Sequence, residues 1–174
     1  MSGPVAVRWQ ARPGLEAQFR AVAATLERWD GTPYQPNKQD RGPGGGVDCV
    51  RFVAGVLDDL RGKRTPIETL PPDAAMHDRP RAIAAMLKLR RALEPNDEIK
   101  PVAGVLLVEP GDVVVTGPVD GAGGHALLVG TQPNVLWESN NVGVRRVGMS
   151  ALKRAGIAVF HAFRPTDKAA WGRE

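Results

Sequence analysis

The sequence predicts a single α+β domain in which N-terminal helices pack on a C-terminal antiparallel β-sheet or partial barrel. Three observations support this. The length of 174 residues suits one domain of ordinary size. Apolar residues recur at helical spacing in the first half of the chain, and after residues 94–97 the chain changes to short Val- and Leu-rich runs. Helices first and strands second favour α+β over alternating βαβ units. We treat residues 1–174 as one domain with its core at about 14–165.

Three segments place apolar residues at i, i+3 and i+4 and are expected to be helices: Gly14–Trp29, Cys49–Leu60 and Pro80–Leu93. Asp48 is a good N-cap for the second segment, and Gly62 is a suitable C-terminal stop. Pro80 suits the first position of the third. The polar, Gly- and Pro-rich residues 34–46 and the Pro-containing residues 65–78 are expected to be irregular.

Six short runs in the second half are expected to be strands: Val102–Val108, Asp112–Thr116, His125–Gly130, Val135–Ser139, Val144–Val147 and Ile157–Phe163. Turn residues such as Glu109-Pro110-Gly111 and Gln132-Pro133-Asn134 separate them. Because helices come first and strands second, an antiparallel sheet is expected rather than a βαβ wound sheet.

Composition limits the functional classes. The net charge of +4 suits either an anionic polymer as partner or simply a well-solvated surface. No basic and aromatic run resembles a nucleic-acid motif, so we expect no specific nucleic acid. No apolar run approaches the ~18–20 residues of a membrane span, and the N-terminal residues lack the pattern of a secretory signal peptide. We therefore expect no membrane insertion and no export by the general secretory route.

The stretch GGGVDCVRF, residues 44–52, contains the only cysteine of the chain. If a helix begins after Asp48, Cys49 lies at its N-terminus, where the macrodipole and unpaired N–H groups favour the thiolate. Those N–H groups also suit an oxyanion, and the preceding glycines would let a substrate backbone pass close by. The alternative is a loop followed by a buried, inert cysteine.

A cysteine nucleophile needs a base, and the chain has three histidines. His77 lies in a loop and is interpreted as a surface or capping residue. His161 lies inside an apolar strand, where a structural role is expected. His125 follows a Gly-rich run and opens a strand, so its ring would face a cleft at the edge of the sheet. We therefore pair His125 with Cys49, which only the fold can bring together.

Several motifs then occur in a telling order: WDGTPY, GVDCVRFVAGVLDDL, EPGDVVVTG and GGHALLVG. This order resembles the NlpC-like peptidoglycan endopeptidases, which are papain-like cysteine peptidases. The resemblance is greatest to the phage cell-wall peptidase or tail-assembly branch, which shares the Trp-x-Gly-Thr-Pro-Tyr turn and tends to end in Ala-Phe-Arg-x-Pro; here the chain has His161-Ala162-Phe163-Arg164-Pro165. It covers roughly Leu26 to Pro165.

The resemblance implies a papain-like fold and a role for each matching residue. Cys49 is the nucleophile, and His125 is the base and later the acid. Tyr34 lies beside Cys49 and helps to bind substrate or the oxyanion. Asp48 contacts the free amine of a stem peptide, serves as an N-cap, or does both. Val50 and Arg51 replace the small residues usual after the cysteine, and we expect Arg51 to reshape the substrate groove.

The third catalytic position does not match the family. A polar residue, often His, is expected on the strand after the catalytic histidine, but this chain has Leu136-Trp137-Glu138-Ser139. Because side chains alternate along a strand, a one-residue difference decides whether Trp137 or Glu138 faces His125. Glu138 would hold the imidazole tautomer, whereas Trp137 would leave the pair without a polar partner. Asn140 and Asn141 are further candidates.

The expected function is cleavage of peptidoglycan stem peptides, at a γ-D-glutamyl-diaminopimelate type of bond, by a component of a phage tail or tail-like particle. The protein would stay in the cytoplasm until it assembles with tail or baseplate proteins. No cofactor is expected, and no cluster shows metal-ligand spacing. The alternatives are a tail component that kept the fold without activity, and a cytosolic acyl-transfer or deamidating enzyme.

Overall fold

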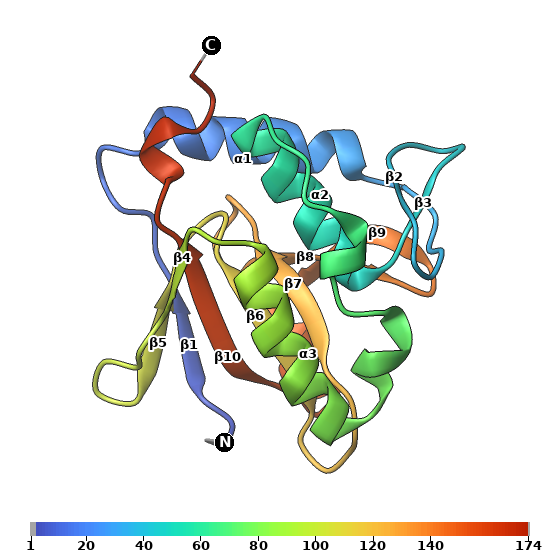
Figure 1. Cartoon of the computed structure of the whole chain (residues 1–174). Coiled ribbons are helices and arrows are strands. Elements are labelled where there is room, and N and C mark those ends of the chain that lie inside the picture. The colour runs from blue at the N-terminus through green and yellow to red at the C-terminus, as the bar shows by residue number, and fades with distance from the viewer. Residues whose placement is uncertain (1–2, 174) are drawn as a thin grey trace.

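The computed structural model describes residues 3–173 and contains one six-stranded antiparallel sheet with helices beside it (Figure 1). This confirms the predicted α+β class. The helices are α1 (Glu16–Trp29), α2 (Cys49–Arg61), α3 (Arg79–Ala92) and the short α4 (Met149–Arg154). The strands, in their order across the sheet, are β4 (Asn96–Glu98), β10 (Ile157–Pro165), β6 (Val113–Pro118), β7 (His125–Val129), β8 (Val135–Asn140) and β9 (Gly143–Gly148).

Two small sheets flank this one. β1 (Ala6–Trp9) pairs in parallel with β5 (Val105–Val108), and β2 (Gln39–Asp40) forms a hairpin with β3 (Gly46–Val47). The sequence analysis missed β1, β4 and α4, because each is too short for a period to emerge. Within the predicted irregular region 65–78, the chain forms two 3₁₀ helices, η1 (Ile67–Thr69) and η2 (Asp73–His77).

Helix α2 lies at the centre of the molecule and packs against α1, β7 and β8 (Figure 1). Every residue of α2 except Asp59 and Arg61 is buried, so the helix is covered on more than the one apolar face that its sequence predicts. Its close contact with α1 depends on Gly55, because a Cβ there would lie 2.5 Å from the Trp29 ring. The helix ends at Gly62, which adopts the left-handed conformation (φ 64°).

The central strands are buried on both faces. On β7, Ala126 and Leu128 belong to the core that includes α2, whereas Leu127 and Val129 belong to a second core on the other face. This alternation is the period of two expected of a strand. It also places His125, the first residue of β7, on the same face as Leu127.

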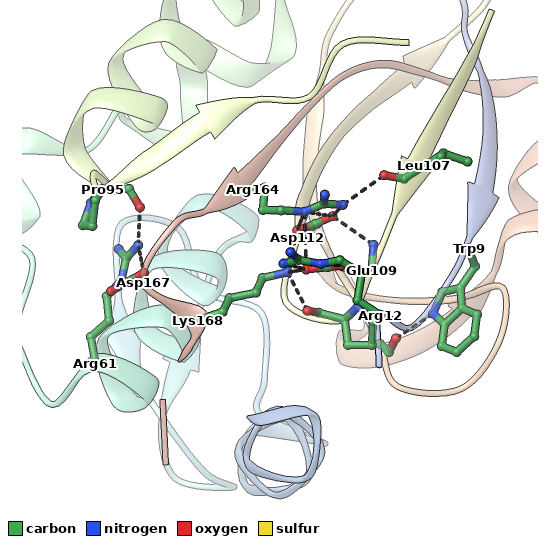
Figure 2. A network of polar contacts seen from close by, with 12 residues as sticks. Trp9, Arg12, Arg61, Pro95, Leu107, Glu109, Asp112, Arg164, Asp167 and Lys168 are labelled. Carbon is green, nitrogen blue, oxygen red and sulfur yellow. Dashed lines mark hydrogen bonds and ion pairs between the residues drawn. The ribbon is translucent and has the colours of Figure 1, made fainter. Parts of the chain in front are cut away.

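A buried ionic network joins the two ends of the chain to the sheet (Figure 2). Lys168, in η3 (Lys168–Ala170), donates to Glu109 at 3.1 Å, to Asp112 at 2.6 Å and to the Pro110 carbonyl at 2.8 Å. Arg12, in the N-terminal segment, binds Glu109, and Arg164, in β10, binds both carboxylates. Glu109 and Asp112 are 0% exposed, so their charges depend on these partners.

Candidate active site

Cys49 is the first residue of α2, which is where the sequence analysis placed the start of the helix. The Asp48 side chain caps the helix by accepting a hydrogen bond from the backbone N–H of Arg51 at 2.9 Å. The thiol therefore lies at the positive end of the helix dipole. Only 4% of Cys49 is exposed.

The glycines before Cys49 are required by their own hairpin. A Cβ on Gly45 would overlap the backbone of Asp40, and one on Gly46 would lie 2.5 Å from the Gln35 side chain. A Cβ on Gly44, in contrast, would meet nothing within 4 Å. The close approach at Gly45 and Gly46 is thus to the loop itself, rather than to the substrate backbone expected from the sequence.

His125 pairs with Glu138 and lies near enough to Cys49 for the cysteine to affect its charge. Its Nε2 is 2.8 Å from Glu138 Oε2, and 27% of its side chain is exposed. Burial disfavours the imidazolium, but the charge and hydrogen bonding of Cys49, and then of Glu138, outweigh burial and raise the pKa of His125 to about 10. Because Nε2 faces Glu138, the ring nitrogen left for the sulfur is Nδ1.

Glu138, and not Trp137, faces the histidine. In the register of β7 and β8, Leu128 is opposite Trp137 and Val129 is opposite Leu136. Leu136, two residues before Glu138, belongs with Leu127 to the second core, whereas Trp137 belongs to the core that includes α2. Glu138 therefore shares the face of Leu127 and His125. The Trp137 ring points to the other face, where it contacts Gly130 and lies 5.3 Å below the Arg146 guanidinium. Of the two alternatives that the sequence left open, the structure has the one with a polar partner for the imidazole.

Two further side chains hold Glu138. Its Oε1 accepts hydrogen bonds from Asn140 Nδ2 at 2.9 Å and from Arg145 Nε at 3.1 Å. The sequence analysis kept Asn140 in reserve and missed Arg145. A signal for Arg145 was present, because only residues 140–143 separate the predicted strands at 135–139 and 144–147, and a hairpin centred on that gap pairs 139 with 144. That symmetry places Glu138 opposite Arg145, as β8 and β9 have it.

Asp48 and Arg51 lie inside the protein. The Asp48 carboxylate is 0% exposed and accepts from Arg51 Nη1 at 3.0 Å and from the Asn37 N–H at 2.6 Å. Arg51 also donates to the Pro71 carbonyl at 3.2 Å. A substrate amine would reach Asp48 only by displacing one of these partners. Arg51, only 3% exposed, fixes neighbouring backbone beneath the surface and does not border an open groove.

Tyr34 lies near the thiol. Its backbone pairs with Val47 in an isolated parallel bridge, two residues before Cys49. Burial and then a hydrogen bond with Asp73 raise the pKa of the Tyr34 phenol well above its usual value, with smaller effects from Cys49 and Asp48. The phenol therefore stays protonated and keeps an O–H donor on this side of the site.

The other two histidines lie apart from the cysteine. The His77 side chain is 71% exposed and pairs with Asp73 at 3.1 Å. His161 Nδ1 lies 3.1 Å from Glu98 Oε1, on the edge strand β4. Burial lowers the pKa of His161, with Glu98 and Arg90 acting in opposite directions. These positions match the surface and structural roles given to them from the sequence.

A cavity of about 530 Å³ reaches this cluster from the histidine side. His125, Glu138 and Arg145 form polar parts of its wall, and Leu152 and Ile157 lie on the apolar side. Cys49 is not among the described residues that line it. The open approach is therefore to the imidazole and its carboxylate, whereas Cys49 does not border this cavity.

Within residues 3–173, no group of three or more His, Cys, Asp or Glu side chains is arranged to hold a metal ion. None of the helices described for this chain combines the length and hydrophobicity of a membrane span. In comparisons with known proteins, no family model matches the chain, and no curated protein matches it. Membership of the NlpC-like peptidases therefore stays a prediction from the sequence motifs.

Proposed function

We propose that the protein is a papain-like cysteine peptidase with Cys49 as nucleophile, His125 as base and Glu138 as the partner of the histidine. The observation that supports this best is the contact of His125 Nε2 with Glu138 Oε2 at 2.8 Å, on a histidine whose pKa is raised by Cys49 as well as by Glu138. A carboxylate that accepts from Nε2–H leaves the Nδ1 lone pair to take the thiol proton.

The proposed reaction follows from this arrangement of Cys49, His125 and Glu138. The Cys49 sulfur attacks the scissile carbonyl carbon, and the charge moves to the carbonyl oxygen. In the first turn of α2, the N–H groups of Arg51 and Phe52 already bind Asp48, which leaves those of Cys49 and Val50 for the oxyanion. The imidazolium then protonates the leaving amine, and a thioester forms. Water, deprotonated by His125, hydrolyses the thioester and releases Cys49.

The proposed substrate is the peptide stem of peptidoglycan, cut at a γ-D-glutamyl-diaminopimelate type of bond. This rests on the sequence resemblance, as does the proposed place of action in a phage tail or tail-like particle beside baseplate proteins. Before assembly the protein would reside in the cytoplasm. The net charge of +4 suits contact with an anionic wall.

A second candidate is a tail component that retains the fold without activity. The observation that favours it is the low exposure of Cys49, 4%, behind a cavity whose lining in the described chain does not include the sulfur. If this face opens only after a partner binds, the isolated protein would be inactive. The presence of Glu138 beside His125 removes the earlier reason for this candidate, which was the lack of a polar partner.

The experiment is to incubate the purified protein with peptidoglycan and identify soluble products by mass spectrometry. We expect fragments with one new amino terminus and one new carboxyl terminus per cut, absent with Cys49→Ala at equal thermal stability. Equal products from wild type and Cys49→Ala would exclude the peptidase. No products from either, with Cys49 inert toward alkylation, would favour the structural candidate.

A further inference from the structure

The Glu138 carboxylate is held by more groups than the histidine alone. Oε2 faces His125 Nε2 at 2.8 Å, and Oε1 accepts from Asn140 at 2.9 Å and from Arg145 at 3.1 Å. The side chain of Glu138 is only 6% exposed. Arg145 lies directly opposite Glu138 in the β8–β9 ladder, so the register of the hairpin brings the two charges together.

A glutamate needs such support at this position. Its side chain has three torsions, and burial alone would favour the neutral acid. A protonated Glu138 would donate to Nε2, which would place the ring proton on Nδ1, the nitrogen that must accept from Cys49. The two donors on Oε1 fix the carboxylate plane and leave Oε2 to accept from the imidazole.

The charges around Glu138 agree with this. Burial raises the pKa of Glu138, but the hydrogen bonds and charges of His125 and then of Arg145 outweigh burial and lower it. His77, which lines the same cavity, pairs with Asp73 of η2. Helix α4 and the residue after it contribute only uncharged Ala151, Leu152 and Ala155 to the cavity wall. Arg145 is thus the permanent cation beside the carboxylate.

We propose that Arg145 is a positioning residue, which acts through Glu138 to hold the His125 ring with Nε2–H bound to the carboxylate and Nδ1 left to take the Cys49 proton, so that the imidazolium forms. The inference rests on the proposed cysteine chemistry but not on the identity of the substrate. Asn140 supports the same oxygen without charge. Because 51% of the Arg145 side chain is exposed, solvent screens its charge, and the directed Nε–H bond matters more than the field.

The neighbouring Arg146 provides a matched control. It lies on the same strand and carries the same charge, but it is opposite Trp137 and stacks on that ring at 5.3 Å, on the other face of the sheet. Arg145→Met and Arg146→Met therefore remove equal charge from adjacent positions, and only the first frees Glu138 Oε1.

The test is the pH dependence of Cys49 alkylation by iodoacetamide, with kcat/KM on wall fragments measured in parallel. In Arg145→Met we expect the acid limb to move toward neutral pH by about one unit and the rate at pH 6 to fall roughly tenfold. Arg145→Lys should recover part of both, and Arg146→Met should follow the wild type. A change in folding stability alone would lower the plateau of the pH–rate profile without moving its acid limb.

Coincident profiles for Arg145→Met and Arg146→Met would overturn the inference. Alkylation needs no peptidoglycan, so the two proposals fail separately. If the acid limb of the alkylation profile shifts in Arg145→Met but the wild type does not hydrolyse the wall, the role of Arg145 stands and the proposed substrate is rejected. If the wild type hydrolyses the wall but the limb does not shift, the proposed substrate stands and the role of Arg145 is rejected.

Discussion

At the scale of single residues, the site depends on how His125 is placed between two groups that favour its charged form. Cys49 and Glu138 outweigh burial and raise the pKa of His125 to about 10, whereas burial lowers that of His161. The sequence could predict Cys49 and His125, because a helix start and a strand start mark them. It could not decide between Trp137 and Glu138. That choice depends on the register between β8 and β7, which decides which of the two side chains is on the same face of the sheet as His125.

The two histidines should therefore titrate on opposite sides of pH 6.5. We expect the His125 ring signals in NMR to stay those of an imidazolium through neutral pH, and His161 to lose its proton below pH 6.5. Since the pKa of His125 is raised on folding, its contribution to stability is complete below pH ~6.5 and is lost as the pH rises toward 10. Midpoints near ~6.5 for both rings would contradict this electrostatic picture.

At the scale of elements, two structural features position the Cys49 thiol. The Asp48 cap, with its buried bond to Arg51, sets the first turn of α2, and the β2–β3 hairpin leads the chain into it. The helix boundary could be read from Asp48 and the apolar spacing. The hairpin could not, because β2 and β3 have only two residues each, and the glycines in it fit a loop as well as a binding edge.

Removing the Asp48 side chain that caps α2 should strongly lower the stability of the protein. Asp48→Ala would leave the 3% exposed Arg51 without its anionic partner, so we expect a loss of about 3–5 kcal/mol in the free energy of unfolding by urea. The matched control is Asp78→Ala at the N-cap of α3, where the side chain is 51% exposed and the bond to Arg81 N is 3.4 Å. There we expect about 1 kcal/mol or less. Equal losses would show that the Asp48–Arg51 pair adds nothing beyond a cap.

Neighbouring glycines in the same hairpin should differ in how much their replacement by alanine lowers the stability of the protein. Gly45→Ala forces a Cβ into the backbone of Asp40, and we expect it to cost about 1–3 kcal/mol in thermal or urea unfolding. At Gly44 a Cβ has nothing within 4 Å, so Gly44→Ala should stay within about 0.5 kcal/mol of the wild type. A loss of activity in a fully stable Gly45→Ala would instead favour direct contact of this glycine with substrate.

At the scale of the whole molecule, an N-terminal and a C-terminal segment are both held at the start of β6, at the other end of that strand from the histidine. At the turn before β6, Lys168 binds Glu109 and Asp112, and Arg12 binds Glu109 (Figure 2). His125 pairs with Thr116, in the second half of β6. The α+β class and most strands could be predicted from periodicity. This network could not, because lone charged residues distant in sequence show no pattern until the chain has folded.

Lys168→Met should destabilise the fold by about 3–5 kcal/mol, because it leaves Asp112 and Glu109 buried with fewer cations. Lys100→Met, at a side chain 84% exposed, should change stability by less than about 0.5 kcal/mol. The charge network lowers the pKa of Glu109, so its stabilisation is present above pH ~4.5 and is lost in more acidic solution. The gap between wild type and Lys168→Met should therefore narrow in acid. A constant gap would contradict an ionic origin.

The central claim is that His125 activates Cys49, and the most direct measurement is the second-order rate of Cys49 alkylation by iodoacetamide at pH 7. The wild type, His125→Ala and Glu138→Gln are compared at matched folding stability. The account predicts that His125→Ala reacts at least about tenfold more slowly than the wild type, with Glu138→Gln between them. Equal rates for all three would show that the thiol is an ordinary buried cysteine, which would contradict the proposed peptidase activity.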